Sequence, residues 1–435
     1  MFVVLRIRDY RLVLTGQLLS STGNWLLLVA GPYFVFHLTS STIATGLSLM
    51  AQTVPAVLLG TVAGVFADRW NRRHTMIATD VLRAATVLSM LAVHTRGAVW
   101  IIYAALTVES AFSQFFEPAR RALVPSLVGR GPELSAANAL SQLIGGVIRL
   151  IVGPLGGVLY VFFGFPCVVA IDAGSYLASA LLIVSIRFRP PAARPPPSAA
   201  RGAPVRHFTH ELRTGIRHVW RTPGLRSLFG VALLFFTGNA MLTALLVPYL
   251  GAVLHAGAQS LGILFGALGF GYIFGAPLSR LVAGRISNRA TTTAALAMLA
   301  AVFAVSFNVP HFGWDVALFT LIGPPAVCFL VTADTSITRR TPDRRQGRVG
   351  SAYLALQGTA TLAGMAAGSV LGQRIGIVTT MDLAAALIAV SAASGLLTPA
   401  SDGSPADGRG LDERPDIAGA GSQGVAAGGR ASGVG

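Results

Sequence analysis

The sequence contains twelve apolar runs that are each long enough to cross a lipid bilayer as an α-helix. Because backbone polar groups cannot stay unpaired in lipid, this pattern predicts an all-α membrane protein with twelve transmembrane helices. A chain that is 53% hydrophobic and 11% charged also has too little polar surface to cover a soluble protein of this size. We place the runs at 12–37, 42–67, 75–94, 98–120, 136–163, 166–187, 227–251, 258–283, 290–309, 313–335, 348–373 and 377–397.

Positive charge is carried by arginine alone and lies mostly in alternate loops. Of the 33 arginines, 29 fall on one face of the predicted bundle, whereas the opposite loops hold Arg96 and Arg374, and Arg83 and Arg149 lie inside spans. Arginine is retained in cytoplasmic loops, so this asymmetry predicts an inner-membrane protein with both termini cytoplasmic. The net charge of +16 is then a topology signal rather than a nucleic-acid footprint. The absence of lysine excludes the P-loop lysine of an ATP-driven pump.

A proline-rich segment in the middle of the chain divides the spans into two sets of six. We expect a first six-helix bundle over 1–188, a cytoplasmic linker over 189–226 and a second six-helix bundle over 227–398. Within the linker, His207–Trp220 has the pattern of an amphipathic helix on the inner membrane surface. The tail, 399–435, has almost no bulky apolar residue, and we expect it to be a disordered cytoplasmic segment.

The second apolar run ends in a short motif of one acid and three arginines. Gly64, Asp68, Arg69, Arg72 and Arg73 match G-x-x-x-D-R-x-x-R-R, and this motif resembles the loop between the second and third helices of the major facilitator superfamily. In the fifth run, an element similar to the G-P-x-x-G-G of antiporter members is formed by Gly153, Pro154, Gly156 and Gly157. The segments 115–125 and 136–140 look like the branch that includes enterobactin exporters and macrolide-efflux proteins.

The resemblance implies a transporter in which two six-helix bundles rock about a central cavity. We expect a secondary active transporter that exports amphipathic small molecules, such as a drug, a siderophore or a secondary metabolite, by proton antiport. Its expected partners are this small-molecule substrate, protons and the lipid bilayer, and we expect a monomer without a cofactor. Two alternatives stay open: a nutrient importer or uniporter, and a non-transporting membrane sensor that has kept the fold.

Ionisable residues inside spans are candidates for proton coupling, because charge is costly at membrane depth. Glu109 and Arg149 are each about midway along consecutive spans and are expected to form either a static pair or a proton-accepting pair. Asp172 has no evident partner in the sequence. It is either in water near the outer mouth or shifted toward its neutral form, as a proton or cation site.

The acid of the loop motif suggests a gate. The resemblance implies that Asp68 engages the facing half, or the end of the fourth span that carries Glu117 and Arg120, while the inner side is closed. The alternative, a topology signal, explains the arginines but not the single acid.

Polar and aromatic residues near mid-span are candidates for the cavity wall, although for each one helix packing is the simpler interpretation. These candidates are Asn24, Gln52, Phe112, Gln142, Phe235, Asn239, Tyr353 and Gln357. Asn24 stands where the branch often has an aspartate, so either the coupling group lies elsewhere in this chain or the chain lacks proton coupling. Gly262 and Gly266 lie inside an apolar span and predict close helix packing rather than a nucleotide loop. With no metal-spaced histidine cluster and no nucleophile elbow, we expect neither a metal site nor an enzyme.

Overall fold

The computed structural model of the chain describes residues 2–67, 70–187, 204–282, 285–309 and 311–396. Side chains are described in these ranges except at 2, 61–67, 149 and 204–212. The predicted tail and the proline-rich part of the predicted linker lie outside the described residues. All the described residues belong to one compact unit, Met1–Ala400.

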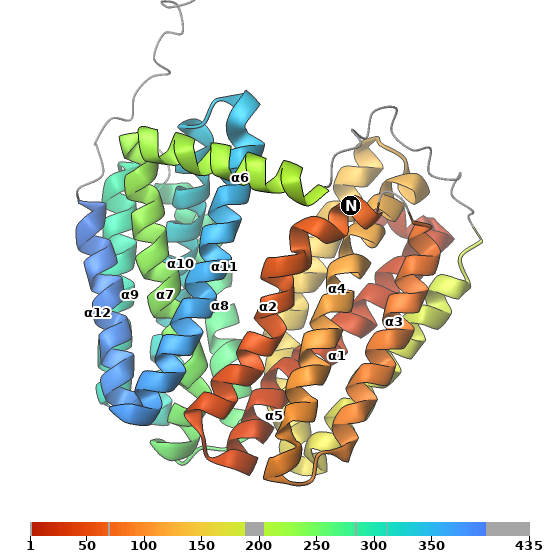
Figure 1. Cartoon of the computed structure of the whole chain (residues 1–435), viewed down its shortest axis with the longest axis horizontal. Helices are drawn as coiled ribbons and strands as arrows, with labels where there is room; N and C mark the ends of the chain where they lie inside the picture. The colour runs from red at the N-terminus through yellow and green to blue at the C-terminus, as the bar shows by residue number, and fades with distance from the viewer. Residues whose placement is uncertain (1, 68–69, 188–203, 283–284, 310, 397–435) are drawn as a thin grey trace, which may run out of the picture. The chain divides into compact units, whose positions relative to one another are not determined.

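The described residues form helices almost throughout (Figure 1). In the first half these are η1 (Phe2–Arg6), α1 (Arg8–Thr39), α2 (Thr42–Ala67), α3 (Arg72–Leu88), η2 (Ser89–Ala92), η3 (Arg96–Ala98), α4 (Val99–Val128) and α5 (Pro132–Val184). In the second half they are α6 (Pro204–Arg221), α7 (Pro223–Ala252), α8 (Ala258–Val282), α9 (Asn288–Asn308), α10 (Phe312–Arg339), α11 (Asp343–Arg374) and α12 (Ile377–Gly395).

Helix α5 is long enough to cross a membrane twice. Eleven described helices are long and apolar enough to span, and one of them, α5, has 53 residues, about 80 Å at the helical rise, against a hydrocarbon core of about 30 Å. Its course breaks at Gly164, where φ is 76° and ψ is 175°, a conformation that a residue with a Cβ avoids. Pro166 follows two residues later and lacks the N–H that a continuous helix would use. The predicted count of twelve spans is therefore confirmed, with the turn between the fifth and sixth at Gly164.

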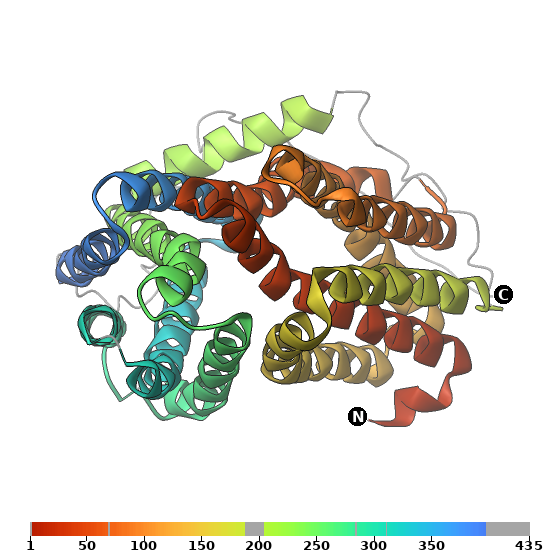
Figure 2. The same cartoon turned by 90° about the horizontal axis from the view of Figure 1, so that it is seen from below.

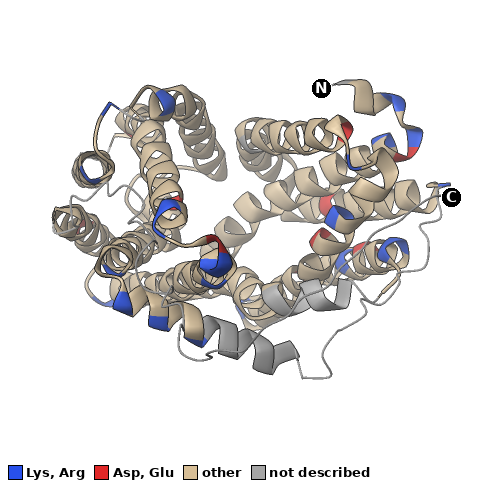
Figure 3. Cartoon of the chain, turned by 90° about the horizontal axis from the view of Figure 1, so that it is seen from above, with Lys and Arg blue, Asp and Glu red and all other residues tan. Residues whose placement is uncertain are grey.

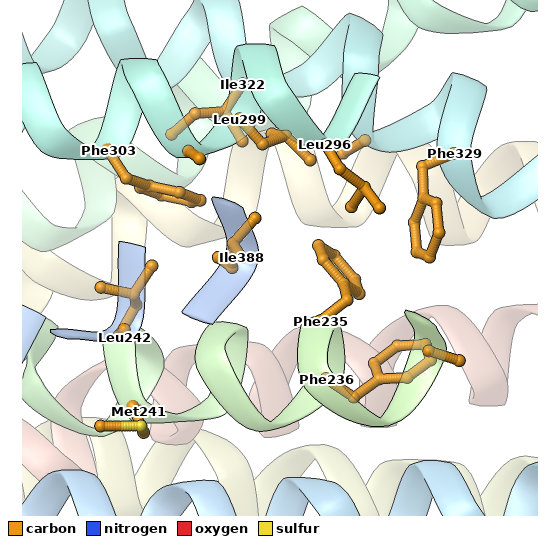
Figure 4. Packing of buried hydrophobic residues seen from close by; sticks show 14 of the residues in the cluster. Phe235, Phe236, Met241, Leu242, Leu296, Leu299, Phe303, Ile322, Phe329 and Ile388 are labelled. Carbon is orange, nitrogen blue, oxygen red and sulfur yellow. The ribbon is translucent and has the colours of Figure 1, made fainter. Parts of the chain in front are cut away.

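The spans pack as two bundles, α1–α5 and α7–α12, and the view from below separates them clearly (Figure 2). In the first bundle α1 lies against α5, and α3 lies against both α4 and α5. In the second bundle α7 packs on α11 and α12, while α8 packs on α10. Each bundle has its own apolar core, and in the second bundle Phe235 and Leu242 from α7 lie opposite Phe303 from α9 and Ile322 from α10 (Figure 4).

One end of the 1–400 unit carries most of the basic residues, and we call it the basic face. It includes the start of α1, helix α6 and the turn between α10 and α11, as the views from the side and from above show (Figures 1 and 3). Helix α6 has the bounds Pro204–Arg221, close to the amphipathic helix expected at His207–Trp220.

The bundles contact each other mainly near the end opposite the basic face. At the start of α2, the Thr42 hydroxyl donates to the backbone oxygen of Ser369 on α11 at 2.8 Å, and it lies 3.2 Å from the side-chain oxygen of Gln373. Nearby, Gly251 on α7 lies against the ring of Phe36 on α1. Helices α5 and α8 form the most extensive contact between the bundles.

Candidate functional site: a buried charge cluster and an aromatic pocket

A guanidinium group sits inside the first bundle and joins three helices. Arg83 on α3 donates to one carboxylate oxygen of Glu109 on α4 through Nε at 3.0 Å and through Nη2 at 2.7 Å. The same Nη2 lies 2.8 Å from the hydroxyl of Tyr176 on α5, and the guanidinium carbon lies 4.0 Å from the centre of the Tyr176 ring. The Tyr176 hydroxyl in turn donates to Glu109 at 2.9 Å. All three side chains are buried, so the contact is a charge pair shielded from solvent.

Two further carboxyl groups, those of Asp80 and Asp172, lie close to this pair. Asp80, one turn before Arg83 on α3, has an oxygen 3.5 Å from Nη1 of Arg83. Asp172, one turn before Tyr176 on α5, packs against Gly23 of α1. Both aspartates are fully buried, and neither carboxyl group accepts a hydrogen bond of normal length and angle from a described residue, although Ser179 lies near Asp80 and Tyr176 lies near Asp172. The cluster therefore holds three carboxyl groups and one guanidinium, which we call the buried charge cluster: Asp80, Arg83, Glu109, Asp172 and Tyr176.

The structure gives Glu109 a partner that sequence reasoning did not assign. Glu109 was expected to pair with Arg149, whose side chain lies outside the described residues, so that pairing stays a prediction. The sequence predicts that Arg83 lies inside a span, and its contact with Glu109 is found only in the structure. A signal was present in the sequence, because Asp80 and Arg83 are three residues apart on one helix and Asp172 and Tyr176 are four apart. Such spacings put both members of each pair on the same helix face.

The burial of Asp172 excludes one of the two environments predicted for it. The first, water near the outer mouth, is wrong, because Asp172 is fully buried and lies among α1, α3 and α5. The second, a group held in its neutral form, is the basis of a proposal below. Asn24, which replaces the aspartate common in the branch, is the neighbour of Gly23, and the carboxyl group of Asp172 lies against Gly23 from another helix.

The arginines of the loop motif bind within the first bundle. Arg72 donates to the backbone oxygen of Ala122 on α4 at 2.9 Å, and Arg73 donates to the backbone oxygen of Ile183 near the end of α5 at 3.2 Å. Cations are favourable at a helix C-terminus, so Arg73 stabilises the end of α5. Asp68 and Arg69 lie outside the described residues, and Gly64 belongs to the part of α2 whose side chains are not described, so the gate stays a prediction.

The other two residues of the predicted gate pair with each other. Glu117 accepts hydrogen bonds from Arg120 at 2.6 and 3.0 Å and from Arg121 at 2.9 Å, all within α4. Arg120 also donates to the side chain of Gln17 on α1 at 2.9 Å. In this conformation Glu117 and Arg120 thus link α4 to α1.

The antiporter-like motif on α5 forms the contact with α8 of the other bundle. A Cβ at Gly262 would come within 2.5 Å of the backbone oxygen of Gly153 and 2.7 Å of the Cα of Pro154. A Cβ at Gly157 would come within 2.6 Å of the Cα of Gln259, and Gly156 lies against Leu26 of α1. The close packing predicted for the glycines of α8 is confirmed, and it occurs across the boundary between the bundles.

A pocket with a volume of about 200 Å³ lies within the second bundle. Six phenylalanines from α7, α8, α9 and α10 and four side chains with polar atoms contribute to its wall, and none of the described residues that line it is charged. Its lining residues include Phe235, Phe236, Phe265, Phe303, Phe307, Phe319, Asn239, Thr243, Tyr272 and Gln357. We call this the aromatic pocket.

Three of the eight cavity candidates, Phe235, Asn239 and Gln357, line the aromatic pocket. Tyr353 lines a separate pocket of about 310 Å³ beside Asp334 and Thr338, toward the basic face. The remaining four lie in the first bundle: Asn24 and Phe112 are half-buried, Gln142 is exposed, and the side-chain nitrogen of Gln52 is buried without a partner among the described residues.

Comparisons with known proteins agree with the fold and with the loop motif. A family described as "Transmembrane secretion effector" matches residues 1–415. The multidrug efflux pump Tap of Mycolicibacterium fortuitum is 29% identical over 79% of this chain and 85% of that protein. The enterobactin exporter EntS of Citrobacter koseri is 26% identical over 82% of this chain and 83% of that protein.

Some alignments are shorter. The match to the uncharacterized transporter YfiS of Bacillus subtilis is 31% identical and spans 40% of that protein, and the match to macrolide efflux protein A of Streptococcus pyogenes is 23% identical and spans 64% of it. Among solved structures, a bacterial homologue of the iron transporter ferroportin in an inward-facing state superimposes with a TM-score of 0.73 over 91% of this chain and 99% of that one, at 14% identity. At that identity the likeness shows the fold alone.

Proposed function

The chain belongs to the transmembrane secretion effector family of major facilitator transporters, and on that premise we propose that it exports amphipathic small molecules in exchange for protons. It is a multi-pass membrane protein of a bacterial transporter family. The relatives described as a multidrug efflux pump and an enterobactin exporter support export as the direction of transport. The observation that supports exchange for protons is the buried charge cluster.

The cluster holds more acids than its single guanidinium can balance. If Asp80, Glu109 and Asp172 were all ionised, the cluster would carry a net charge of −2 inside the bundle, where unpaired charge is costly. Glu109 receives hydrogen bonds from Arg83, Tyr176 and Ser113, so it is the ionised member. Asp80 and Asp172 then hold protons, which makes the cluster neutral.

Exchange of partners by Arg83 would couple a proton to a conformational change. When Arg83 turns from Glu109 toward Asp172, Asp172 loses its proton and Glu109 takes one up. Each arrangement is balanced, so the cluster has two stable states, as a switching transporter requires. In this mechanism Asp172, whose carboxyl group accepts no hydrogen bond of normal geometry in the present arrangement, carries the proton. Arg83 is the positive group that changes partner, and Tyr176 positions both side chains.

The aromatic pocket is the proposed substrate site. Phenylalanine rings and four polar side chains, without a described charged residue, suit an amphipathic molecule that contains an aromatic ring. The proton site and the substrate site lie in different bundles, so they are linked through the contact between α5 and α8 and the contact between α2 and α11. We place the chain in the bacterial inner membrane with its basic face toward the cytoplasm, by the positive-inside rule.

The proton mechanism is tested with Asp172→Asn, which keeps the size of the side chain but cannot release a proton. Purified protein is reconstituted in liposomes, and uptake of the aromatic dye Hoechst 33342 is followed with an acidic lumen. In the wild type, we expect the gradient to accelerate dye entry and the lumen to become alkaline. The variant should bind the dye and exchange it between the two sides without a gradient, but the gradient should no longer accelerate entry.

Glu133→Gln is the matched control, because Glu133 is an exposed carboxylate at the start of α5, away from the cluster. It should behave as the wild type. Gradient-driven uptake at the wild-type rate by Asp172→Asn would contradict the mechanism. The direction is tested in cells: an exporter lowers accumulation of the dye relative to cells without the protein, an importer raises it, and a non-transporting sensor leaves it unchanged.

A further inference from the structure

Helix α6 presents an arc of arginines and apolar residues that does not pack on the rest of the protein. Arg213, Ile216, Arg217, Trp220 and Arg221 are spaced by three or four residues and are all exposed. At 3.6 residues per turn, they cover one side of the helix. Trp220 is 67% exposed and Ile216 is 43% exposed, large values for apolar side chains next to arginines. We call these five residues the linker-helix surface.

The opposite side of α6 is fixed to the second bundle. Gly215 lies against the backbone of Arg348 on α11, and Val219 is buried in the core of the second bundle. Nδ1 of His218 is 2.9 Å from Nη1 of Arg345. Burial and the charge of Arg345 lower the pKa of His218, so its ring is neutral at pH 7 and accepts this hydrogen bond. Because this side is anchored, the linker-helix surface faces away from the bundle.

The surface lies next to the start of a helix long and apolar enough to span a membrane, and further positive charge lies at the same end of the unit. Helix α6 ends at Arg221, and the spanning helix α7 begins at Pro223, so the last turn of α6 is two residues from a transmembrane segment. The last residue of α10 and the first turn of α11, at the same end, add the exposed arginines Arg339 and Arg344. The one acid of that turn, Asp343, accepts a hydrogen bond from Gln346.

We propose that the linker-helix surface binds the headgroups of anionic phospholipids. Arginine forms paired hydrogen bonds with phosphate, and tryptophan prefers the boundary between headgroups and hydrocarbon. The surface has three arginines that can bind the phosphate and an exposed tryptophan that can lie against the start of the acyl chains. Both are within a few residues of a spanning helix, at the depth where these parts of a lipid are found. An acidic soluble peptide or a free phosphate would satisfy the arginines but leave Trp220 and Ile216 in water.

The test measures lipid binding directly, independently of transport. The full-length protein, purified and stripped of lipid, is titrated with phosphatidylglycerol or phosphatidylcholine, and bound lipids are counted by native mass spectrometry. We expect tighter binding of phosphatidylglycerol by the wild type. The triple variant Arg213→Gln, Arg217→Gln, Arg221→Gln should weaken this binding about tenfold or more, because it removes the three positive charges that attract the anionic headgroup.

Three controls separate this proposal from its rivals. Arg280→Gln with Arg285→Gln, exposed arginines near the α8–α9 turn, should leave binding unchanged. Replacing the three linker-helix arginines by lysine should restore most of the affinity for phosphatidylglycerol. That result would show that the substituted helix still folds. Trp220→Ala should weaken the binding of phosphatidylglycerol but not the binding of glycerol phosphate. Unchanged affinity in the glutamine variant, equal affinity for the two lipids, or glycerol phosphate binding as tightly as phosphatidylglycerol would each overturn the proposal.

Discussion

Arg83 and Glu109 meet through two hydrogen bonds to a single carboxylate oxygen, at 2.7 and 3.0 Å, in the interior of the first bundle. The two residues come from adjacent helices, α3 and α4, and both side chains are almost completely buried. A pair in this environment is stable only while both members are present, because a single buried charge has no solvent to screen it.

The first prediction follows from this dependence. Arg83→Gln should destabilise the protein by about 3 kcal/mol or more, because Glu109 is left as an uncompensated buried charge. The double variant with Glu109→Gln should recover part of that loss, since both charges are removed together. Thermal unfolding in detergent, analysed as a double-mutant cycle, measures the coupling. Strictly additive effects would contradict the interaction.

The second prediction concerns Gly23, whose lack of a side chain leaves room for Asp172. A Cβ at Gly23 would come within 2.5 Å of the Ser175 hydroxyl and would also overlap the carboxyl group of Asp172. Gly23→Ala should therefore separate α1 from α5, cost about 1–3 kcal/mol and reduce proton-driven dye uptake. Gly31→Ala, also on α1, is the control, because a Cβ there meets no atom within 4 Å. Equal melting temperatures for the two variants would argue against the packing described for Gly23.

The third prediction addresses the glycine contact between α5 and α8. Gly262→Val would place side-chain atoms against the backbone of Gly153 and Pro154, so the two bundles could no longer approach at this point. We expect the protein to remain folded, because each bundle has its own core, and dye transport to fall about tenfold or more. The control is Gly174→Ala on α5, which has open space around the new Cβ. Normal transport by Gly262→Val would mean that this contact does not limit the cycle.

The fourth prediction concerns the aromatic pocket. Phe303→Ala removes a ring from the pocket wall, and loss of one aromatic contact should weaken binding of an aromatic dye about fivefold to tenfold. Phe270→Ala is matched in chemistry, but Phe270 is 50% exposed on α8 and is not among the described lining residues, so it should have no effect. Dye binding is measured by fluorescence titration of the purified protein without a gradient. Equal affinities for the two variants would remove the pocket from substrate binding.

The sequence by itself determined the membrane fold, because span length and the cost of charge in lipid are properties of single segments. Twelve apolar runs predicted twelve spans, and the break at Gly164 fell between two of them, at a residue that tolerates positive φ next to a proline. The glycines on α8 predicted close packing for the same local reason, since a missing Cβ lets another backbone approach. The loop motif likewise identified the superfamily from residues adjacent in the chain.

Only the tertiary structure decided which polar groups meet. Arg83, Glu109 and Tyr176 come from three helices and are separated by 26 and 67 residues in the chain, so their contact depends on how α3, α4 and α5 rotate against one another. The same holds for the aromatic pocket, which includes Phe235, Asn239 and Gln357 but not the other five candidates. Hydrophobic periodicity says that a residue is inside a bundle, but the partner that it faces is set by packing between helices, and that packing is a property of all of them together.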